Sequence, residues 1–149
     1  MKYFAYGSNM NSKRMEEKRV PFLKRRSAKL RGYKLKFNKI ATRKTNEGYA
    51  NIVADLNSIV EGVLYDVLES GLNRLNGYEG VPDGHYKRMQ VTVQLHNGEE
   101  VEAITYIANP DKVKEKLKPR KKYLSHLLAS KDILSEAYYK ELEKTETLD

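Results

Sequence analysis

The sequence predicts an α+β fold with a twisted or barrel-like sheet. About five or six segments in the first two thirds of the chain have strand patterns, most of them suited to antiparallel pairing. Short helical patterns lie among these segments, and a longer helical pattern closes the chain. Strands that come first and helices that come last indicate an α+β layout. The 149 residues suit one domain, which we assign to 1–149.

The first strand leads directly into a helix. Residues 3–6 form an aromatic and apolar run that ends at Gly7, as is typical of a buried strand closed by a turn. Either Asn11 or Ser12 can cap a helix over roughly 12–19, because their side-chain oxygens accept from free N–H groups of a first turn. The order strand, turn and helix is therefore expected within the first twenty or so residues.

Three strand segments follow. After Leu30, the apolar residues at 33, 35 and 37 alternate with lysines at 34 and 36, which predicts a strand with one face inward. The polar segment 43–49 predicts a loop. Residues 51–54 and 59–65 are rich in β-branched side chains and predict two further strands.

A short helix and an irregular segment occupy the middle of the chain. Ser70 is a suitable cap for a helix whose apolar residues are spaced three apart. Residues 76–84 then contain three glycines and one proline, which predicts a backbone without regular structure.

A hairpin and the closing helices complete the chain. Residues 89–95 and 101–107 predict two strands, and the Asn97-Gly98 pair between them is a strong hairpin signal. After Pro119 the apolar spacing becomes helical and predicts one or two helices.

Several classes of protein are excluded or disfavoured. The chain has no cysteine, which excludes disulfides and thiol chemistry and fits the cytoplasm. It lacks both an apolar run long enough to span a membrane and a signal peptide. The three histidines lie far apart in sequence, and no metal-binding or nucleotide-binding motif is present. We therefore expect neither a metal nor an organic cofactor, and no membrane partner.

Charge is distributed unevenly along the chain. Residues 1–45 contain 15 Lys and Arg against 2 Asp and Glu, whereas the whole chain has a net charge of +8. A basic half suits an acidic partner, such as nucleic acid or a negatively charged small molecule, but it equally suits a solvated lysine-rich surface. We favour the solvated surface, because many of these charges alternate along strands. Nucleic acid is accordingly not the expected partner.

Two segments offer chemistry. Residues 6–9 (Tyr-Gly-Ser-Asn) follow a strand and precede a helix, so their N–H groups can form a cradle for a carboxylate or an oxyanion. An ordinary strand-to-helix turn is the plainer interpretation. Glu79 lies among aromatic and apolar residues, where a raised pKa would suit a general base. An exposed loop glutamate is the plainer interpretation there.

Taken together, these segments resemble the γ-glutamyl cyclotransferase family, in which we include its AIG2-like and γ-glutamylamine cyclotransferase-like members. Residues 3–10 read YFAYGSNM and resemble the signature at the start of that family. Residues 79–81 (Glu-Gly-Val), followed by Gly84 and Tyr86, resemble the family's catalytic segment. Pro119 and Tyr123 resemble a third block, although Ala129-Ser130 stands where a Gly-Ala pair often follows. The blocks occur in the family's order over nearly the whole chain.

The resemblance implies a small, mixed and partly closed β-barrel flanked by helices. It also implies an enzyme that converts a γ-glutamyl amino acid or γ-glutamyl amine to 5-oxoproline and a free amine without a cofactor. Glu79 would be the general acid and base. The substrate-binding residues implied are Tyr3, Tyr6, Gly7, Ser8, Asn9, Tyr86 and Tyr123. The loops 38–50 and 108–120 are expected to complete the pocket wall.

Alternatives stay open at the level of the sequence. The same chemistry could remove a γ-glutamyl protecting group from a biosynthetic intermediate. A non-catalytic binding module of the same fold could instead serve as a nucleic-acid or protein adaptor, for which the basic first half with Tyr33 and Phe37 is the best support. The chain could be a monomer or a homodimer.

Overall fold

A computed structural model describes all residues, Met1–Asp149. Five strands form the sheet: β1 (Lys2–Ala5), β2 (Phe22–Ile40), β3 (Gly48–Val67), β4 (Tyr86–Leu95) and β5 (Glu100–Ala108). Four α-helices accompany it: α1 (Ser12–Glu17), α2 (Glu69–Tyr78), α3 (Lys121–Leu128) and α4 (Glu136–Glu143). Three short 3₁₀ turns complete the regular structure: η1 (Ser8–Met10), η2 (Val81–Asp83) and η3 (Pro110–Lys112).

The sheet closes into a barrel in the order β1-β3-β2-β4-β5. The neighbouring strands pair antiparallel, except that β1 meets β5 in parallel at Tyr3 and Ile104. The predicted mixed barrel is thus confirmed. It is closed rather than partly closed, because the short strand β1 pairs with a neighbour on each of its two edges.

The two central strands are longer than the sequence predicts. β2 has 19 residues and β3 has 20, and they pair along nearly their whole length. The segments predicted as two strands, 51–54 and 59–65, are one strand that bends at a register shift opposite Gly32. Gly32 has a φ of +84°, which suits glycine and accommodates the bulge. The polar residues inside β3 at this bulge interrupt the apolar pattern and conceal its continuity.

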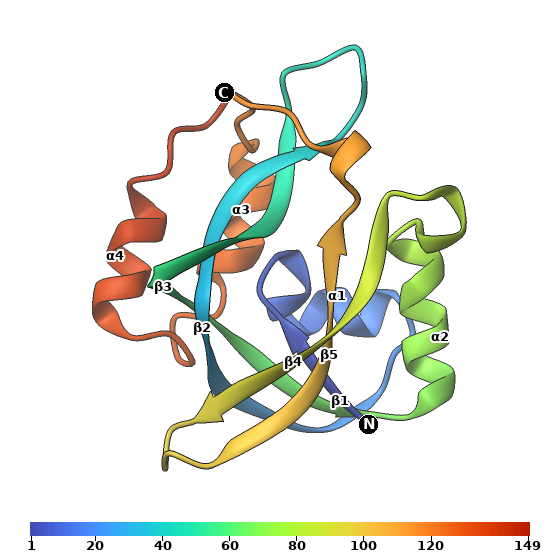
Figure 1. Cartoon of the computed structure of the whole chain (residues 1–149), viewed down its shortest axis with the longest axis vertical. Helices are drawn as coiled ribbons and strands as arrows, with labels where there is room; N and C mark the ends of the chain where they lie inside the picture. Colours follow the sequence, from blue (N-terminus) through green and yellow to red (C-terminus); the bar gives the residue numbers. More distant parts are fainter.

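The helices lie outside the barrel, with α3 and α4 on one side and α2 on the opposite side (Figure 1). Asn11 caps α1 as predicted, because its side chain accepts from the N–H of Lys13. Ser70 does not cap α2, because this helix begins at Glu69, two residues earlier than a helix capped by Ser70 would, and Leu68 is in the cap position. Leu72 and Leu75 of α2 are fully buried and fix this helix against the barrel. None of the helices has the length and apolar composition that crossing a bilayer requires.

Candidate active site

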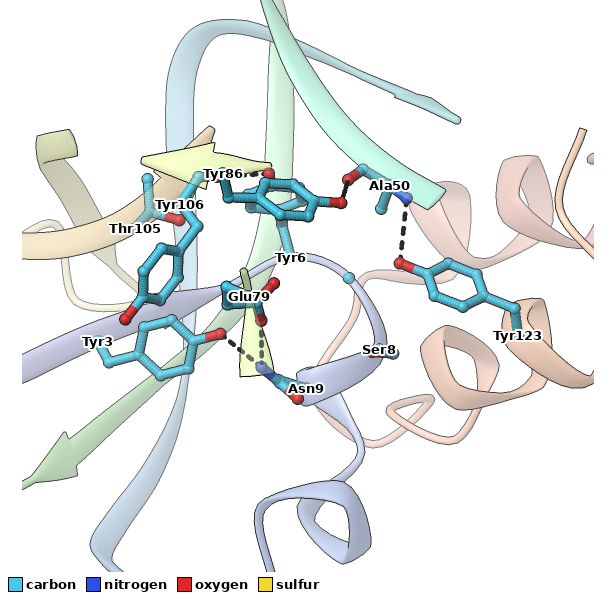
Figure 2. Close-up of a pocket in the computed structure, with 11 residues that line it drawn as sticks. Tyr3, Tyr6, Ser8, Asn9, Ala50, Glu79, Tyr86, Thr105, Tyr106 and Tyr123 are labelled. Carbon is cyan, nitrogen blue, oxygen red and sulfur yellow. Dashed lines mark hydrogen bonds between the residues drawn. The ribbon is translucent and has the colours of Figure 1, made fainter. Parts of the chain in front are cut away.

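All the site residues suggested by the sequence lie around one small pocket. The pocket has a volume of about 40 Å³. Its lining comes from β1 and the turn after it, β3, the end of α2, β4, β5 and α3 (Figure 2): Tyr3, Tyr6, Gly7, Ser8, Asn9, Ala50, Glu79, Tyr86, Thr105, Tyr106 and Tyr123. The fold therefore brings together the three sequence blocks that are far apart along the chain.

A wider pocket of about 370 Å³ adjoins the small one. The two share four lining residues, Ser8, Glu79, Tyr86 and Tyr123. We refer to the small pocket as the inner pocket and to the wider one as the outer pocket. Glu79 lies at their boundary, so a molecule that spans both pockets places its middle beside this carboxyl group.

The local backbone explains how Glu79 reaches this boundary. It is the last residue of α2's hydrogen-bonding pattern, and its N–H donates to the carbonyl of Leu75 at 2.8 Å. Gly80 then adopts the left-handed conformation with φ +65° and turns the chain away from the helix axis. A Cβ on Gly80 would lie 2.8 Å from the ring of His85, so glycine is needed for space as well. The prediction of an irregular backbone over 76–84 was partly wrong, because 76–78 belong to α2 and 81–83 form η2. The turn at Gly80 between these two elements aims Glu79 inward.

A hydrogen-bonded chain of side chains holds Glu79. The Nδ2 group of Asn9 donates to Oε1 of Glu79 at 3.0 Å and to the hydroxyl oxygen of Tyr3 at 2.9 Å. Lys18 donates from Nζ to Oδ1 of Asn9 at 2.7 Å. An ammonium has only donors, so Lys18 fixes which end of the Asn9 amide faces it and turns Nδ2 toward Glu79. Asn9 and Lys18 are both buried.

Opposing effects set the pKa of Glu79. Burial raises the pKa of this carboxyl above its usual value, and Lys18, the hydrogen bond from Asn9, Lys39 and Arg14 lower it. Burial prevails, so the net direction is upward. A carboxyl group with a raised pKa holds and releases a proton closer to neutral pH than an exposed glutamate does.

The tyrosine hydroxyls divide into two kinds. Those of Tyr6 and Tyr86 donate to backbone carbonyls, at 2.5 Å to Tyr106 and at 2.7 Å to Ala50. Those of Tyr3 and Tyr123 instead accept, from the Asn9 amide and from the N–H of Ala50 at 3.0 Å.

The accepting hydroxyls of Tyr3 and Tyr123 keep their own hydrogens for a bound molecule. Burial raises the pKa of Tyr3, Tyr6, Tyr86 and Tyr123, so all four stay neutral near pH 7. Of the groups that line the inner pocket, Glu79 is therefore the one suited to move protons near neutral pH.

Two close neighbours leave little room for a side chain at Gly7. A Cβ built there would lie 3.1 Å from Cβ of Ala50 and 3.3 Å from the hydroxyl of Tyr123. Its φ of −112° lies outside the left-handed region, so the close approach of two neighbours, rather than handedness, explains the glycine. Its N–H has no hydrogen-bond partner within the chain and is available to a ligand.

The sequence did not single out most residues of the outer pocket individually. The outer pocket is walled by Arg14, Lys18, Lys39, Tyr49, Tyr78 and His85 among others. The loop 38–50 contributes to both pockets as expected, but 108–120 contributes to neither, so that expectation was wrong. The reason is that Asn109–Lys118 is held against the outside of the β2–β3 end, where Lys118 N–H donates to Asn46 and Gly48 N–H donates to Lys118.

Some residues of the basic first half make contacts that stabilise the fold. Arg25 donates to the carbonyl of Met10 and to Ser130, and it forms an ion pair with Asp132. Tyr33 and Phe37, the aromatic residues considered for nucleic-acid stacking, are partly buried and pack against the barrel core.

Comparisons with known proteins identify the family of the chain. The model of the AIG2-like family matches residues 59–142. A curated γ-glutamylcyclotransferase from Bos taurus is 33% identical over 108 residues, which cover 70% of this chain and 57% of the relative. The Homo sapiens protein of the same name is 32% identical over 109 residues, with the same shares covered. The chain thus spans little more than half the length of these curated relatives.

One solved structure overlaps the whole chain. A γ-glutamyl cyclotransferase superposes with a TM-score of 0.88 and 27% identity, over 100% of this chain and 89% of that one. The likeness therefore covers the barrel, the flanking helices and the segments that build both pockets.

Proposed function

The chain belongs to the AIG2-like family, and because similar proteins are named γ-glutamyl cyclotransferases, we propose that it is one as well. The reaction releases 5-oxoproline and a free amine from a γ-glutamyl compound. One observation carries the proposal most strongly. A single carboxyl group, Glu79, with a raised pKa and a fixed hydrogen-bond partner, lies at the junction of two pockets among neutral tyrosines.

The chemistry needs one group that first takes and then gives a proton. The α-amino nitrogen of the γ-glutamyl group attacks its own γ-carbonyl carbon, and the carbonyl electron pair moves to oxygen. The carbonyl then reforms and the bond to the leaving nitrogen breaks. The attacking nitrogen changes from ammonium to lactam N–H and loses two protons, and the leaving nitrogen gains two, so no water is consumed. Glu79 can carry protons from the first nitrogen to the second.

The other residues have matching tasks. The oxyanion of the tetrahedral intermediate needs donors in place before the reaction, and the free N–H of Gly7 and the hydroxyl hydrogens of Tyr3 and Tyr123 can supply them. A ring of buried tyrosines also restricts the substrate to conformations in which the amine lies near the carbonyl.

The test is incubation of the purified chain with a panel of γ-glutamyl amino acids and γ-glutamyl amines. We expect 5-oxoproline to appear with at least one of them. The absence of 5-oxoproline throughout, together with retention of RNA at physiological salt, would instead support the adaptor alternative.

Replacing Lys18 with methionine should change the pH dependence more than the fold. The base must be ionised to act, and Lys18 lowers the pKa of Glu79 against the effect of burial. Its removal therefore raises that pKa further, and kcat/KM should fall about tenfold at acidic pH and recover as the pH rises. The measurement is the pH profile of kcat/KM.

Two variants control for a merely structural effect of Lys18. Lys18→Arg keeps the charge and should retain the wild-type acidic limb. Lys13→Met removes an exposed lysine from α1, the helix that ends just before Lys18, and should leave the profile unchanged. A uniform loss at every pH in Lys18→Met would contradict this effect of the Lys18 charge on the pKa of Glu79.

A further inference from the structure

Lys39 is a buried lysine without an acidic partner. Only 4% of it is exposed, and no carboxylate lies within ion-pair distance of its Nζ. Its Nζ instead donates to the carbonyl of Ile40 at 2.8 Å and to Nδ1 of His85 at 3.0 Å. It also lies 5.8 Å from the ring centroid of Tyr49 and 5.5 Å from that of Tyr86. Buried charges in proteins are usually paired, so this cation requires an explanation.

The donor count leaves room for a ligand. An ammonium has three N–H donors, and two of them are used by Ile40 and His85. Because lysine cannot accept, Nδ1 of His85 carries no hydrogen, and His85 is neutral. Burial lowers the pKa of His85, and the charge of Lys39 lowers it further, which agrees with this assignment. His85 therefore holds Lys39 in place, and one donor of Lys39 remains free.

The surroundings of Lys39 are short of negative charge. The outer pocket is lined by the cations Arg14, Lys18 and Lys39, and its one carboxyl group is Glu79. Lys18 is also buried and forms no ion pair, and Arg14 pairs with the exposed Glu17. An anion that enters the outer pocket thus meets three cations against a single carboxyl group, Glu79.

The position of Lys39 indicates which half of the substrate it would contact. Lys39 lines the outer pocket and not the inner one, whereas Glu79 lines both. In the proposed reaction the scissile amide lies beside Glu79, with the γ-glutamyl half in the inner pocket near the Gly7 N–H. The released half therefore extends into the outer pocket toward Lys39.

We propose that Lys39 binds a carboxylate on the released half of the substrate and so determines specificity for γ-glutamyl amino acids over γ-glutamyl amines. This inference rests on the proposed cyclotransferase function and deepens it. The released amine of a γ-glutamyl amine has no carboxylate, so it leaves the Lys39 charge uncompensated in a buried position. A carboxylate satisfies the free donor and pairs the charge in the same contact.

The experiment compares two substrates in two proteins. The substrates are γ-glutamyl-alanine and γ-glutamyl-alanine amide, which differ in whether the released half carries a charged carboxylate. The ratio of their kcat/KM values is measured in the wild type and in Lys39→Met. We expect the ratio to fall about 10- to 100-fold in the variant, as for loss of a hydrogen bond to a charged group. Intrinsic differences in leaving group cancel, because each protein is compared on the same pair.

Control variants separate specificity from folding. Lys34→Met removes an exposed lysine from the same strand and should retain the wild-type ratio. Lys39→Gln loses the charge but keeps a donor for Ile40, and it serves as the second variant where the methionine variant does not fold. We expect the same fall in its ratio.

Two outcomes overturn the inference in distinguishable ways. An unchanged ratio in folded Lys39 variants would show that the released carboxylate is bound elsewhere, while the cyclotransferase function would stand. Absence of 5-oxoproline from both substrates with the wild type, and from the rest of the panel, would overturn the proposed function and this inference with it.

Discussion

Replacing Glu79 with glutamine is expected to lower the turnover of a γ-glutamyl substrate by about 10²- to 10⁴-fold. Glutamine has nearly the same shape and its Oε1 can still accept from Asn9 Nδ2, as Glu79 does at 3.0 Å. It cannot take the proton from the attacking nitrogen or return it to the leaving nitrogen. The measurement is 5-oxoproline released per minute at saturating substrate. Retention of more than about a tenth of wild-type turnover, far above that loss, would show that another group is the base.

The stability of the Glu79→Gln variant provides the necessary check on folding. Because the pKa of Glu79 is raised in the folded chain, the folded state binds more protons than the unfolded state between the ordinary and the raised value. The folding stability therefore falls as the pH rises through that window. Above the window, the destabilisation caused by the ionised Glu79 is fully present. Removing the carboxylate should leave the midpoint temperature of thermal unfolding at neutral pH unchanged or raise it. Glu16→Gln, which removes an exposed carboxylate from α1, should retain full activity.

Replacing Gly7 with valine should have the second largest effect, about 100-fold in kcat/KM, which is the size expected when a reacting group is misplaced by about 1 Å. The first carbon of the new side chain would lie 3.1 Å from Cβ of Ala50 and 3.3 Å from the Tyr123 hydroxyl. Both Ala50 and Tyr123 line the inner pocket, so their displacement disturbs the substrate directly. The free N–H of Gly7 would also be shielded by the branched side chain.

A graded series makes the Gly7 result interpretable. Gly7→Ala adds only the Cβ, to which the neighbours must yield by a few tenths of an ångström, so its loss should be smaller than that of Gly7→Val. Gly77→Val adds a side chain where nothing lies within 4 Å and should leave kcat/KM unchanged. Equal activity of Gly7→Val and wild type would remove the turn from the proposed site.

The sequence predicts the architecture well where the pattern is local. The alternation on both sides of Asn97-Gly98 predicts the β4–β5 hairpin, and the aromatic run at 3–6 predicts the first strand. It fails at the start of β2, where four basic residues between 24 and 29 conceal a strand that begins at Phe22. These side chains point outward or form ion pairs, so their charge says little about the backbone.

The inner and outer pockets differ in how far the sequence predicts them. Residues of the inner pocket stand in short blocks with unusual composition, such as Tyr-Gly-Ser-Asn and Glu-Gly-Val, and these blocks carry the resemblance to a family. Lys18, Lys39 and His85 of the outer pocket have ordinary neighbours in sequence. Burial distinguishes the two lysines from the many solvated ones, and burial at these positions arises from contacts between segments that are far apart in sequence.

The central claim is ring closure by the substrate's own amine at Glu79, and the most direct test follows the oxygen atoms. The purified chain is incubated with its best γ-glutamyl substrate in water enriched in oxygen-18, and the masses of the products are measured by mass spectrometry. The account predicts unlabelled 5-oxoproline from the wild type and almost none from Glu79→Gln. Glutamate that contains oxygen-18 would mean that water attacks the γ-carbonyl, and it would contradict ring closure by the substrate's own amine.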